Sequence, residues 1–312
     1  MILKLGYACI SDTLNITTSS TYTYTEYLKN SDLNKLDSII KSNLSNLEEI
    51  LKYNIKNNIH FYRLSSKLIP LATKKEVDFD YIEKYRDYYK RISKLIKDND
   101  IRVDFHPDQF CVLNSINEET VENSIEILNY HYRILDALGI ENKVLILHIG
   151  SNVFGKEKSL KRFINNFKKL PNYLQDSIVI ENDDKVFTIE DCLFINKELN
   201  IPIVLDYHHF KCNHEDDNLE NYLQKIFLSW KGKTPKMHFS SPKNYTKKEI
   251  RSHHDYIDSD DFISFIELIK KYNYDIDIMI EAKKKDVALF NLVRMIKYKT
   301  NYEFIDETSF RL

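Results

Sequence analysis

Eight short apolar runs alternate with longer segments of helical periodicity along the 312-residue chain. In the longer segments, such as 33–55 and 80–97, apolar residues recur every three or four positions, which indicates amphipathic helices. Because most of the short runs are continuously apolar, they predict parallel strands buried on both faces. Eight such strands, each followed by a helix, favour a closed (β/α)8 TIM barrel over an open doubly wound sheet. The predicted strands are 2–6, 59–64, 101–106, 143–149, 177–182, 202–206, 235–239 and 275–281.

The boundaries of the predicted elements are marked by a few local signals. Gly139 is suited to the residue just after a helix over 121–139, because glycine tolerates the left-handed backbone found there. The acidic run 258–261 offers N-cap residues for a helix over 262–272. No glycine-rich phosphate loop follows the first strand, which argues against a dinucleotide-binding fold. Without a linker or repeat, we expect a single domain over residues 1–312.

Charge, cysteine content and hydropathy indicate the compartment and the kinds of partner that we expect for the protein. The formal net charge is −2, so nucleic-acid binding would need a local basic surface. The four cysteines show neither CxxC pairing nor zinc-finger spacing, which argues against a disulfide framework. No apolar run approaches the roughly 18 residues of a membrane span. We therefore expect an intracellular protein, a monomer, with no membrane partner.

Histidines and carboxylates stand at or just after the ends of six of the predicted strands. In a TIM barrel, the carboxyl ends of all strands converge on one face, where active sites are built. Two neighbouring pairs leave the choice of residue open: His208 or His209, and His253 or His254. If His209 and His253 are taken from these pairs, the series is His106, His148, Glu181, Asp206, His209, His238, His253 and Glu281.

This set of side chains predicts a metal centre. Imidazole and carboxylate suit zinc, manganese or iron, and the set exceeds the roughly four to six positions around one ion. We therefore expect more than one ion, with Glu181 in the middle of the series placed to bridge two of them. Close divalent ions suit phosphoryl transfer. The alternative is a barrel rim on which acids and histidines only satisfy one another.

Basic residues gather in the last third of the sequence, around the seventh and eighth strands. They are Lys231, Lys233, Lys236, Lys243, Lys247, Lys248 and Arg251, followed by Lys283, Lys284 and Lys285. Such runs are often only a solvated face, but here they flank the strand-end series, and Asn244 and Tyr245 add hydrogen-bonding and stacking groups. Arg63 and Lys67 would extend this surface after the second strand. The pattern predicts phosphate contacts with DNA.

Several longer motifs resemble those of the UV damage endonuclease family over nearly the whole chain. The most specific are HPDQF at 106–110, IENDD at 180–184 and IEAK at 280–283. The others are LGYAC at 5–9, RLSSKLIPLAT at 63–73, LHIGS at 147–151, LDYHH at 205–209 and PKMHFSS at 235–241.

The resemblance implies a barrel related to endonuclease IV that holds about two to three divalent ions, manganese first and zinc as the alternative. It implies incision of damaged double-stranded DNA immediately 5′ of the lesion, leaving 3′-hydroxyl and 5′-phosphate ends. The implied lesions are cyclobutane pyrimidine dimers, 6-4 photoproducts and abasic sites.

The resemblance also assigns residues. It implies His209 rather than His208 and His253 rather than His254 as ligands, and it places Glu181, Lys236 and Glu281 in the catalytic centre. Lys236 matches a lysine that can be carboxylated in the family; an unmodified lysine is the equal alternative. Tyr7, Gln109 and Phe110 match residues that probe the duplex, although many members carry tyrosine in place of Phe110. The DNA-binding residues are completed by Arg63, Lys243, Lys247, Lys248 and Lys283.

Three other functions fit parts of the pattern. An endonuclease IV-like abasic-site nuclease would use the same metals on a different lesion. A sugar isomerase-like barrel also places divalent ions at strand ends, but HPDQF and the lysine-rich loops argue against it. A DNA-binding protein that holds metal without catalysis would keep the ligands and lack the reaction.

Overall fold

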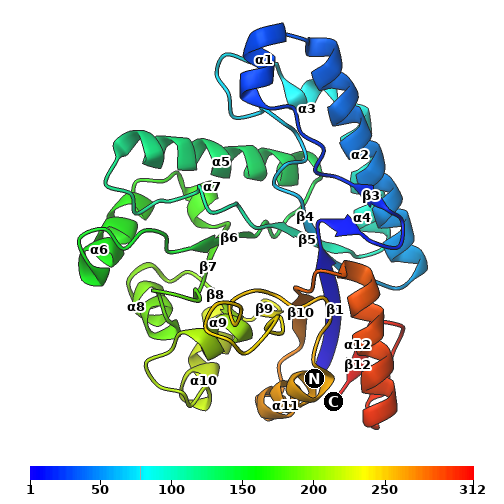
Figure 1. Cartoon of the computed structure of the whole chain (residues 1–312), viewed down its shortest axis with the longest axis vertical. Helices are drawn as coiled ribbons and strands as arrows, with labels where there is room; N and C mark the ends of the chain where they lie inside the picture. Colours follow the sequence, from blue (N-terminus) through cyan, green and yellow to red (C-terminus); the bar gives the residue numbers. More distant parts are fainter. Residues whose placement is uncertain (78) are drawn as a thin grey trace.

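Eight parallel strands close into a barrel in the computed structural model, which describes residues 1–77 and 79–312. Each strand pairs with its neighbours in chain order, and the last returns to the first, with Leu5 opposite Ile278. The TIM barrel predicted from the sequence is thus confirmed (Figure 1). The barrel strands are β1 (Ile2–Ala8), β4 (Phe61–Leu64), β5 (Arg102–Phe105), β6 (Leu145–His148), β7 (Ile178–Glu181), β8 (Ile203–Asp206), β9 (Lys236–Phe239) and β10 (Ile276–Ile280).

Helices surround the barrel on its outer side (Figure 1). One predicted helix, over 80–97, is interrupted at Tyr85, whose ring is buried and whose hydroxyl donates to Asp37 at 3.0 Å. The helices are α1 (Tyr24–Asn30), α2 (Leu33–Lys56), α3 (Tyr81–Lys84), α4 (Arg86–Asp98), α5 (Glu118–Ala137), α6 (Lys156–Phe167), α7 (Asn172–Gln175), α8 (Ile189–Leu199), α9 (Tyr207–Cys212), α10 (Glu220–Ser229), α11 (Ser259–Lys270) and α12 (Lys285–Lys299).

Both predicted helix-end signals are confirmed. Gly139 follows α5 with a φ of +66° and donates its N–H to the Asp136 carbonyl at 2.8 Å. Asp258 is the N-cap of α11, where its carboxylate accepts the N–H groups of Asp260 and Asp261. Each contact satisfies a backbone group that the helix itself leaves unpaired.

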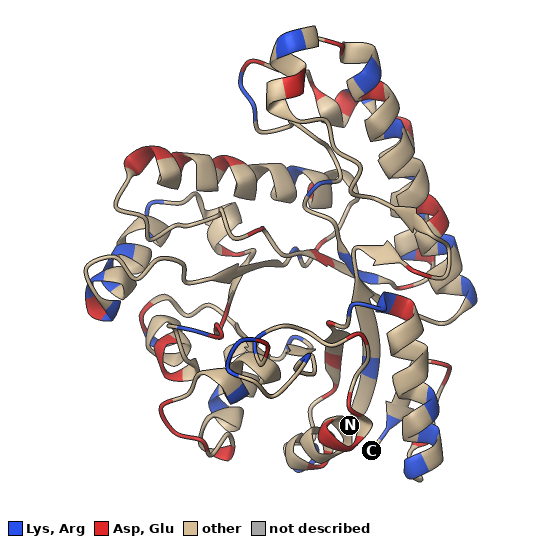
Figure 2. Ribbon diagram, in the orientation of Figure 1, with Lys and Arg blue, Asp and Glu red and all other residues tan. Residues whose placement is uncertain are grey.

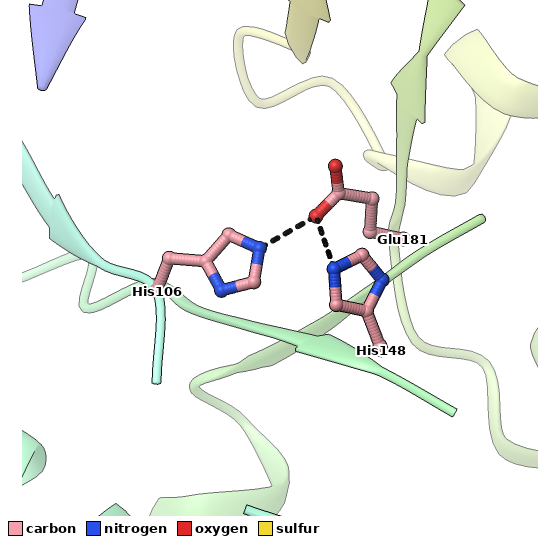
Figure 3. Close-up of side chains that lie close together, drawn as sticks. All are labelled: His106, His148 and Glu181. Carbon is pink, nitrogen blue, oxygen red and sulfur yellow. Dashed lines mark hydrogen bonds and ion pairs between the residues drawn. The ribbon is translucent and has the colours of Figure 1, made fainter. Parts of the chain in front are cut away.

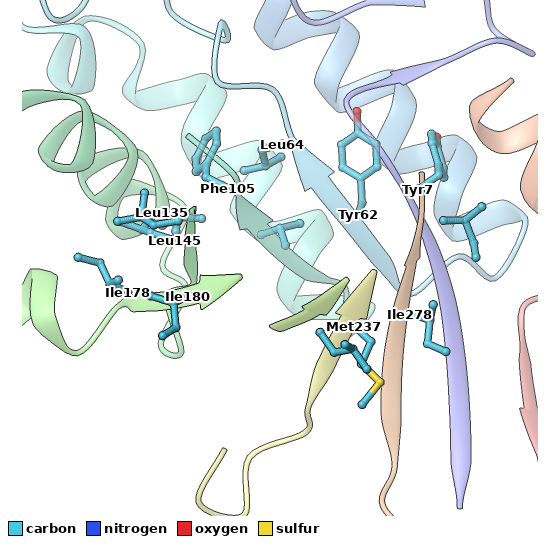
Figure 4. Close-up of a cluster of buried hydrophobic side chains, with 14 of the residues drawn as sticks. Tyr7, Tyr62, Leu64, Phe105, Leu135, Leu145, Ile178, Ile180, Met237 and Ile278 are labelled. Carbon is cyan, nitrogen blue, oxygen red and sulfur yellow. The ribbon is translucent and has the colours of Figure 1, made fainter. Parts of the chain in front are cut away.

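The barrel strands carry apolar side chains on both faces. Outward-facing residues such as Leu145, Ile180 and Met237 pack against the helices in one large core (Figure 4). Inside the barrel, Val144, Val179 and other residues form a smaller, separate cluster. Burial on both faces explains why the strand sequences are continuously apolar rather than alternating.

A short hairpin that the sequence did not reveal completes the sheet. It consists of β11 (Glu303–Phe304) and β12 (Ser309–Arg311), and β12 pairs antiparallel with the first half of β1. A second small pair, β2 (Ile10–Ser11) and β3 (Ile16–Thr17), follows β1. The hairpin brings the two termini side by side (Figure 1). Among the described residues, no helix has the length and apolarity needed to cross a membrane.

Candidate metal centre at the carboxyl ends of the strands

Glu181, the last residue of β7, lies at the middle of the predicted ligand set. Its Oε2 atom is 2.8 Å from His106 Nε2 and 3.8 Å from His148 Nε2 (Figure 3). Its other oxygen, Oε1, accepts a hydrogen bond from His238 Nδ1 at 2.7 Å. Because strands β5, β6, β7 and β9 end on the same face, residues distant in sequence meet at one carboxylate.

Three groups of side chains in this centre have the composition and spacing of metal sites. The ligand atoms within each group lie within 4.8 Å of one another. The groups are His106–His148–Glu181, Glu181–Asp206–His209 and Asp206–His238–Glu281. Glu181 and Asp206 each belong to two groups, so the three form one continuous series. His253, the remaining predicted ligand, places Nδ1 3.9 Å from Glu281 Oε2.

Backbone carbonyls orient two of the imidazole rings. Nδ1 of His106 donates to the Pro107 carbonyl at 2.9 Å, and Nδ1 of His209 donates to the Asn182 carbonyl at 3.0 Å. A contact from a ring nitrogen to a neighbouring polar group is the usual arrangement around metal-binding histidines, and in His106 it leaves Nε2, 2.8 Å from Glu181 Oε2, as the nitrogen turned toward the centre. Asn182 also exchanges two hydrogen bonds with the Asp206 backbone, at 2.9 and 3.0 Å. Sequence reasoning missed this support, although Asn182 lies within the IENDD motif.

Within each of the two histidine pairs that the sequence left open, the geometry shows which member faces the centre. His209 faces Glu181 and Asp206, whereas Nε2 of His208 lies 3.9 Å from the Cys212 sulfur. His253 faces Glu281, whereas His254 is exposed and its Nδ1 accepts the Tyr256 N–H. His209 and His253 are therefore the members that the structure brings into the centre.

The electrostatics of the centre fit a bound cation. Burial opposes ionisation of Glu181, but the rings of His238 and His148 hold its pKa well below its usual range. Burial also works against protonation of His209, yet Asp206 and Glu181 raise its pKa to about 9. The buried Oδ2 atom of Asp206 has no hydrogen-bond partner among the described residues. Unpaired buried oxygens are costly, and a divalent ion would satisfy this one.

Arg63 is placed differently from its predicted role on a DNA-binding surface. It lies in β4 with only 8% of its surface exposed and points into the barrel. Its guanidinium contacts Glu281 Oε1 at 2.7 Å through Nη1 and His238 Nε2 at 2.7 Å through Nη2. Burial opposes its charge, but Glu281 and Asp104 raise the pKa of Arg63 above its usual value. The prediction of an exposed phosphate contact is wrong for this residue.

Lys236 lies deeper in the barrel than the ligands. It opens β9, is fully buried, and donates to Asp104 Oδ2 at 2.5 Å with its ammonium over the Phe61 ring. Burial lowers the pKa of Lys236 to about 7, against the opposing effect of Asp104. It lies two residues before His238, and its side chain is on the same face of β9.

The three residues expected to probe the duplex occupy two different environments. Gln109 and Phe110 are exposed on the loop after β5, and Phe110 keeps 68% of its surface accessible. Tyr7, by contrast, has no exposed surface, and its hydroxyl donates to Asn54 at 2.8 Å. As placed here, Tyr7 packs in the core, which corrects the expectation of a surface contact.

The predicted basic residues also divide between the two ends of the barrel. Lys243, Lys247, Lys248 and Lys283 are exposed on the loops that leave β9 and β10, on the side of the metal-ligand groups. Lys231 and Lys233 precede β9 and therefore lie at the opposite end, which corrects their predicted position. Charges of both signs are spread over the outer helices (Figure 2), so any basic DNA-binding surface is local.

One exposed aromatic residue near the centre was not predicted. Phe154, on the loop after β6, is 71% exposed and has a φ of +65°, a backbone conformation that is rare for a bulky residue. The loop is held in place by Arg162, which donates to the Val153 carbonyl at 2.6 Å. Asn114 links this loop to the loop of Phe110 through two hydrogen bonds to Ser151.

Fold and site together define a TIM barrel whose polar centre lies at the carboxyl ends of the strands. The crystal structure of SacUVDE is similar to this barrel, with a TM-score of 0.87, 33% identity, and coverage of 95% of this chain and 98% of that one. Endonuclease IV from Thermus thermophilus shares the fold, with a TM-score of 0.60, 11% identity, and coverage of 95% of this chain and all of that one.

The chain belongs to the UV-endonuclease UvdE family, whose model matches residues 3–309. The UV DNA damage endonuclease of Bacillus cereus strain B4264 is 41% identical over 300 residues, which cover 94% of each chain. That of Bacillus anthracis is 40% identical over 301 residues, again 94% of each chain. The protein is therefore a DNA repair endonuclease, and the resemblance seen in the sequence is confirmed.

Proposed function

We propose that this endonuclease hydrolyses the phosphodiester immediately 5′ of cyclobutane pyrimidine dimers, 6-4 photoproducts and abasic sites, with divalent metal ions as cofactors. The observation that carries the proposal is the sharing of Glu181 and Asp206 among three ligand groups. About two to three ions, manganese first and zinc as the alternative, fit this series of imidazoles and carboxylates. When bound, they would supply a hydroxide near neutral pH and stabilise charge on the attacking and leaving oxygens.

Residues of the chain would hold the ions and contact the DNA. Glu181 and Asp206 would hold neighbouring ions, and Asn182 fixes the Asp206 backbone. Gln109 offers an amide and Phe110 a flat face to unstacked bases, where an inserted side chain offsets part of the cost of flipping. Exposed lysines such as Lys247 and Lys283 would fix the DNA through its phosphates.

Lys236 is proposed here as a positioning residue in its unmodified form. Its hydrogen bond to Asp104 is that of an ammonium. A carbamate would place a second anion against that buried carboxylate, which is unfavourable without a further cation. Intact mass measured under non-denaturing conditions distinguishes the two forms.

The test of the proposed function uses a duplex with one thymine dimer at a defined position. With Mn²⁺ present, we expect a single nick on the 5′ side of the dimer, and no nick in the undamaged duplex or after chelation. Parallel duplexes with one 6-4 photoproduct or one abasic site test the other lesions. The absence of a lesion-dependent nick from folded, metal-loaded protein would refute the proposal. Nicking confined to the abasic site would favour the endonuclease IV-like alternative.

We further propose that the protein acts inside the cell on double-stranded DNA and does so as a monomer. Because the ligand set comes entirely from one barrel, no second subunit is needed to complete the centre. Light scattering of the free and DNA-bound protein tests this point.

A further inference from the structure

One of the three ligand groups already contains a cation that belongs to the protein. Arg63 contacts two of the three members of the group Asp206–His238–Glu281, at 2.7 Å from Glu281 Oε1 and 2.7 Å from His238 Nε2. A metal ion in this group would therefore compete for carboxylate charge that the guanidinium already neutralises, and it would bind beside a fixed positive charge.

The first ligand group lacks such a neighbour. Over residues 1–77 and 79–312, no lysine or arginine lies within hydrogen-bond or ion-pair distance of His106, His148 or Glu181. Glu181 is instead contacted by the imidazole nitrogens of His106, His148 and His238. A guanidinium keeps its positive charge at any ordinary pH. The two groups thus differ in whether a fixed positive charge of the protein already lies against their ligand atoms.

The fold keeps Arg63 where it is. Its neighbour in register on β5 is Asp104, a fully buried carboxylate 4.0 Å from Arg63 Nε that also pairs with Lys236. On the other side, the Arg63 carbonyl accepts the Cys9 N–H at 2.9 Å. Moving the guanidinium out of the barrel would leave buried carboxylates without a partner, which is strongly unfavourable.

We propose that Arg63 is a positioning residue that makes the metal sites unequal. It holds Glu281 and His238 in place before metal binds, and it causes the ion of the group Asp206–His238–Glu281 to bind last and most weakly. The ion of the group His106–His148–Glu181 binds first and tightly. This inference rests on the proposed metal-dependent function and adds an order of loading to it.

Calorimetric titration of the metal-free protein with Mn²⁺, with bound metal counted by elemental analysis, tests the proposal. The wild-type protein should show a tight and a loose phase. In Arg63→Gln the loose phase should tighten roughly tenfold or more, the size of effect that one nearby charge has on a proton equilibrium. Arg63→Lys keeps the charge and should keep the loose phase. Arg102→Gln, which removes an arginine paired with Asp277 at the other end of the barrel, should change neither phase.

A loose phase that is unchanged or weakened in Arg63→Gln would overturn the proposal. If that variant does not fold, wild-type protein labelled with ¹⁵N-arginine gives the answer: during a Zn²⁺ titration, the Arg63 side-chain signal should shift in the second phase and not in the first. A shift in the first phase would also overturn it. If no metal binds at all, the proposed function fails as well, whereas two phases that are insensitive to Arg63 would refute only this inference.

Discussion

The two ends of the barrel differ in how their buried charged side chains are paired. At the amino end, Arg102 pairs with Asp277 at 2.8 Å, and its guanidinium lies over the rings of Phe61 and Trp230, 5.4 and 5.6 Å from their centroids. At the carboxyl end, carboxylates and imidazoles outnumber the fixed cations, and Asp206 Oδ2 has no partner among the described residues. The pair Arg102–Asp277 at the amino end is satisfied within the protein, whereas the ligand groups at the carboxyl end fit a cation from outside.

A cavity by itself does not mark the functional end of this barrel. A cavity of about 710 Å³ lies at the amino end, lined by Lys4, Arg102, Trp230 and Asp277 among others. The ligand groups lie at the opposite end, where the loops after the strands converge. In TIM barrels the amino end serves stability and the carboxyl end serves chemistry, and the following predictions test that division here.

The largest effect is expected from Glu181→Gln, which keeps the shape of the side chain and removes its charge. Incision of the dimer duplex should fall by about 10³-fold or more, because a central electrostatic contact is lost. DNA binding should be retained, since Glu181 is buried. Single-turnover incision and fluorescence anisotropy measure the two quantities. Near-normal incision would show that the centre does not carry the reaction.

A second, pH-dependent effect follows from His209. The pKa of His209 is about 9 in the metal-free protein. Its bound proton therefore stabilises the folded metal-free protein fully at pH values below the pKa of this histidine in the unfolded chain, and the stabilisation is lost as the pH rises through about 9. Because a metal must displace the proton, metal affinity should rise about tenfold per pH unit below about pH 9 and level off above it. Calorimetry in buffers of different ionisation enthalpy counts the released proton. A pH-independent affinity would contradict the assignment of His209 as a ligand.

Removal of the Asn182 side chain should have a smaller effect on the carboxyl end. Asn182→Ala loses both hydrogen bonds to the Asp206 backbone, and loss of such supporting contacts typically lowers metal affinity or activity about 10- to 100-fold. Asn196→Ala, which removes an amide bonded to the Ile201 carbonyl, is the matched control. Equal effects of the two changes on metal affinity would argue against a role for Asn182.

Phe110 tests whether the exposed loop after β5 contacts the lesion. In the Glu181→Gln background, Phe110→Ala should weaken binding of the dimer duplex by about 1 to 3 kcal/mol, the usual contribution of a stacked aromatic residue. Phe110→Tyr should bind normally, because the flat face is kept. Tyr298→Ala, at an 86% exposed aromatic residue on α12, controls for general surface effects. Anisotropy titrations on damaged and undamaged duplexes distinguish lesion-specific from general binding.

The smallest effect on activity is expected at the amino end. Asp277→Asn leaves Arg102 without its charged partner and should lower the free energy of unfolding by about 1 to 3 kcal/mol. Incision should change by less than about twofold, because this end of a TIM barrel serves stability. Urea unfolding and steady-state incision measure the two outcomes. Loss of incision without loss of stability would contradict the division between the ends.

The local pattern of the sequence was sufficient to predict the fold and the set of candidate ligands. Strand and helix periodicities are properties of neighbouring residues, and a residue that ends a strand such as His148 or Glu181 is recognisable from its own segment. The family motifs separated His209 from His208, a choice that the geometry supports. The amino-end position of Lys231 and Lys233 could also have been read from chain order, since both precede their strand.

The sequence by itself thus determined an eight-stranded barrel with imidazoles and carboxylates at one end. Only the tertiary structure decided which side chains of those strands point inward. Arg63 lies in the run IHFYRL, where no alternation marks the two faces, and the alternation of ILKLGY groups Tyr7 with Leu3 and Leu5 without showing which face lies inside the barrel. Closure of the barrel sets their orientation, sending Arg63 to Glu281 and Tyr7 to Asn54. These contacts join strands and helices far apart in the chain, so no local pattern could encode them.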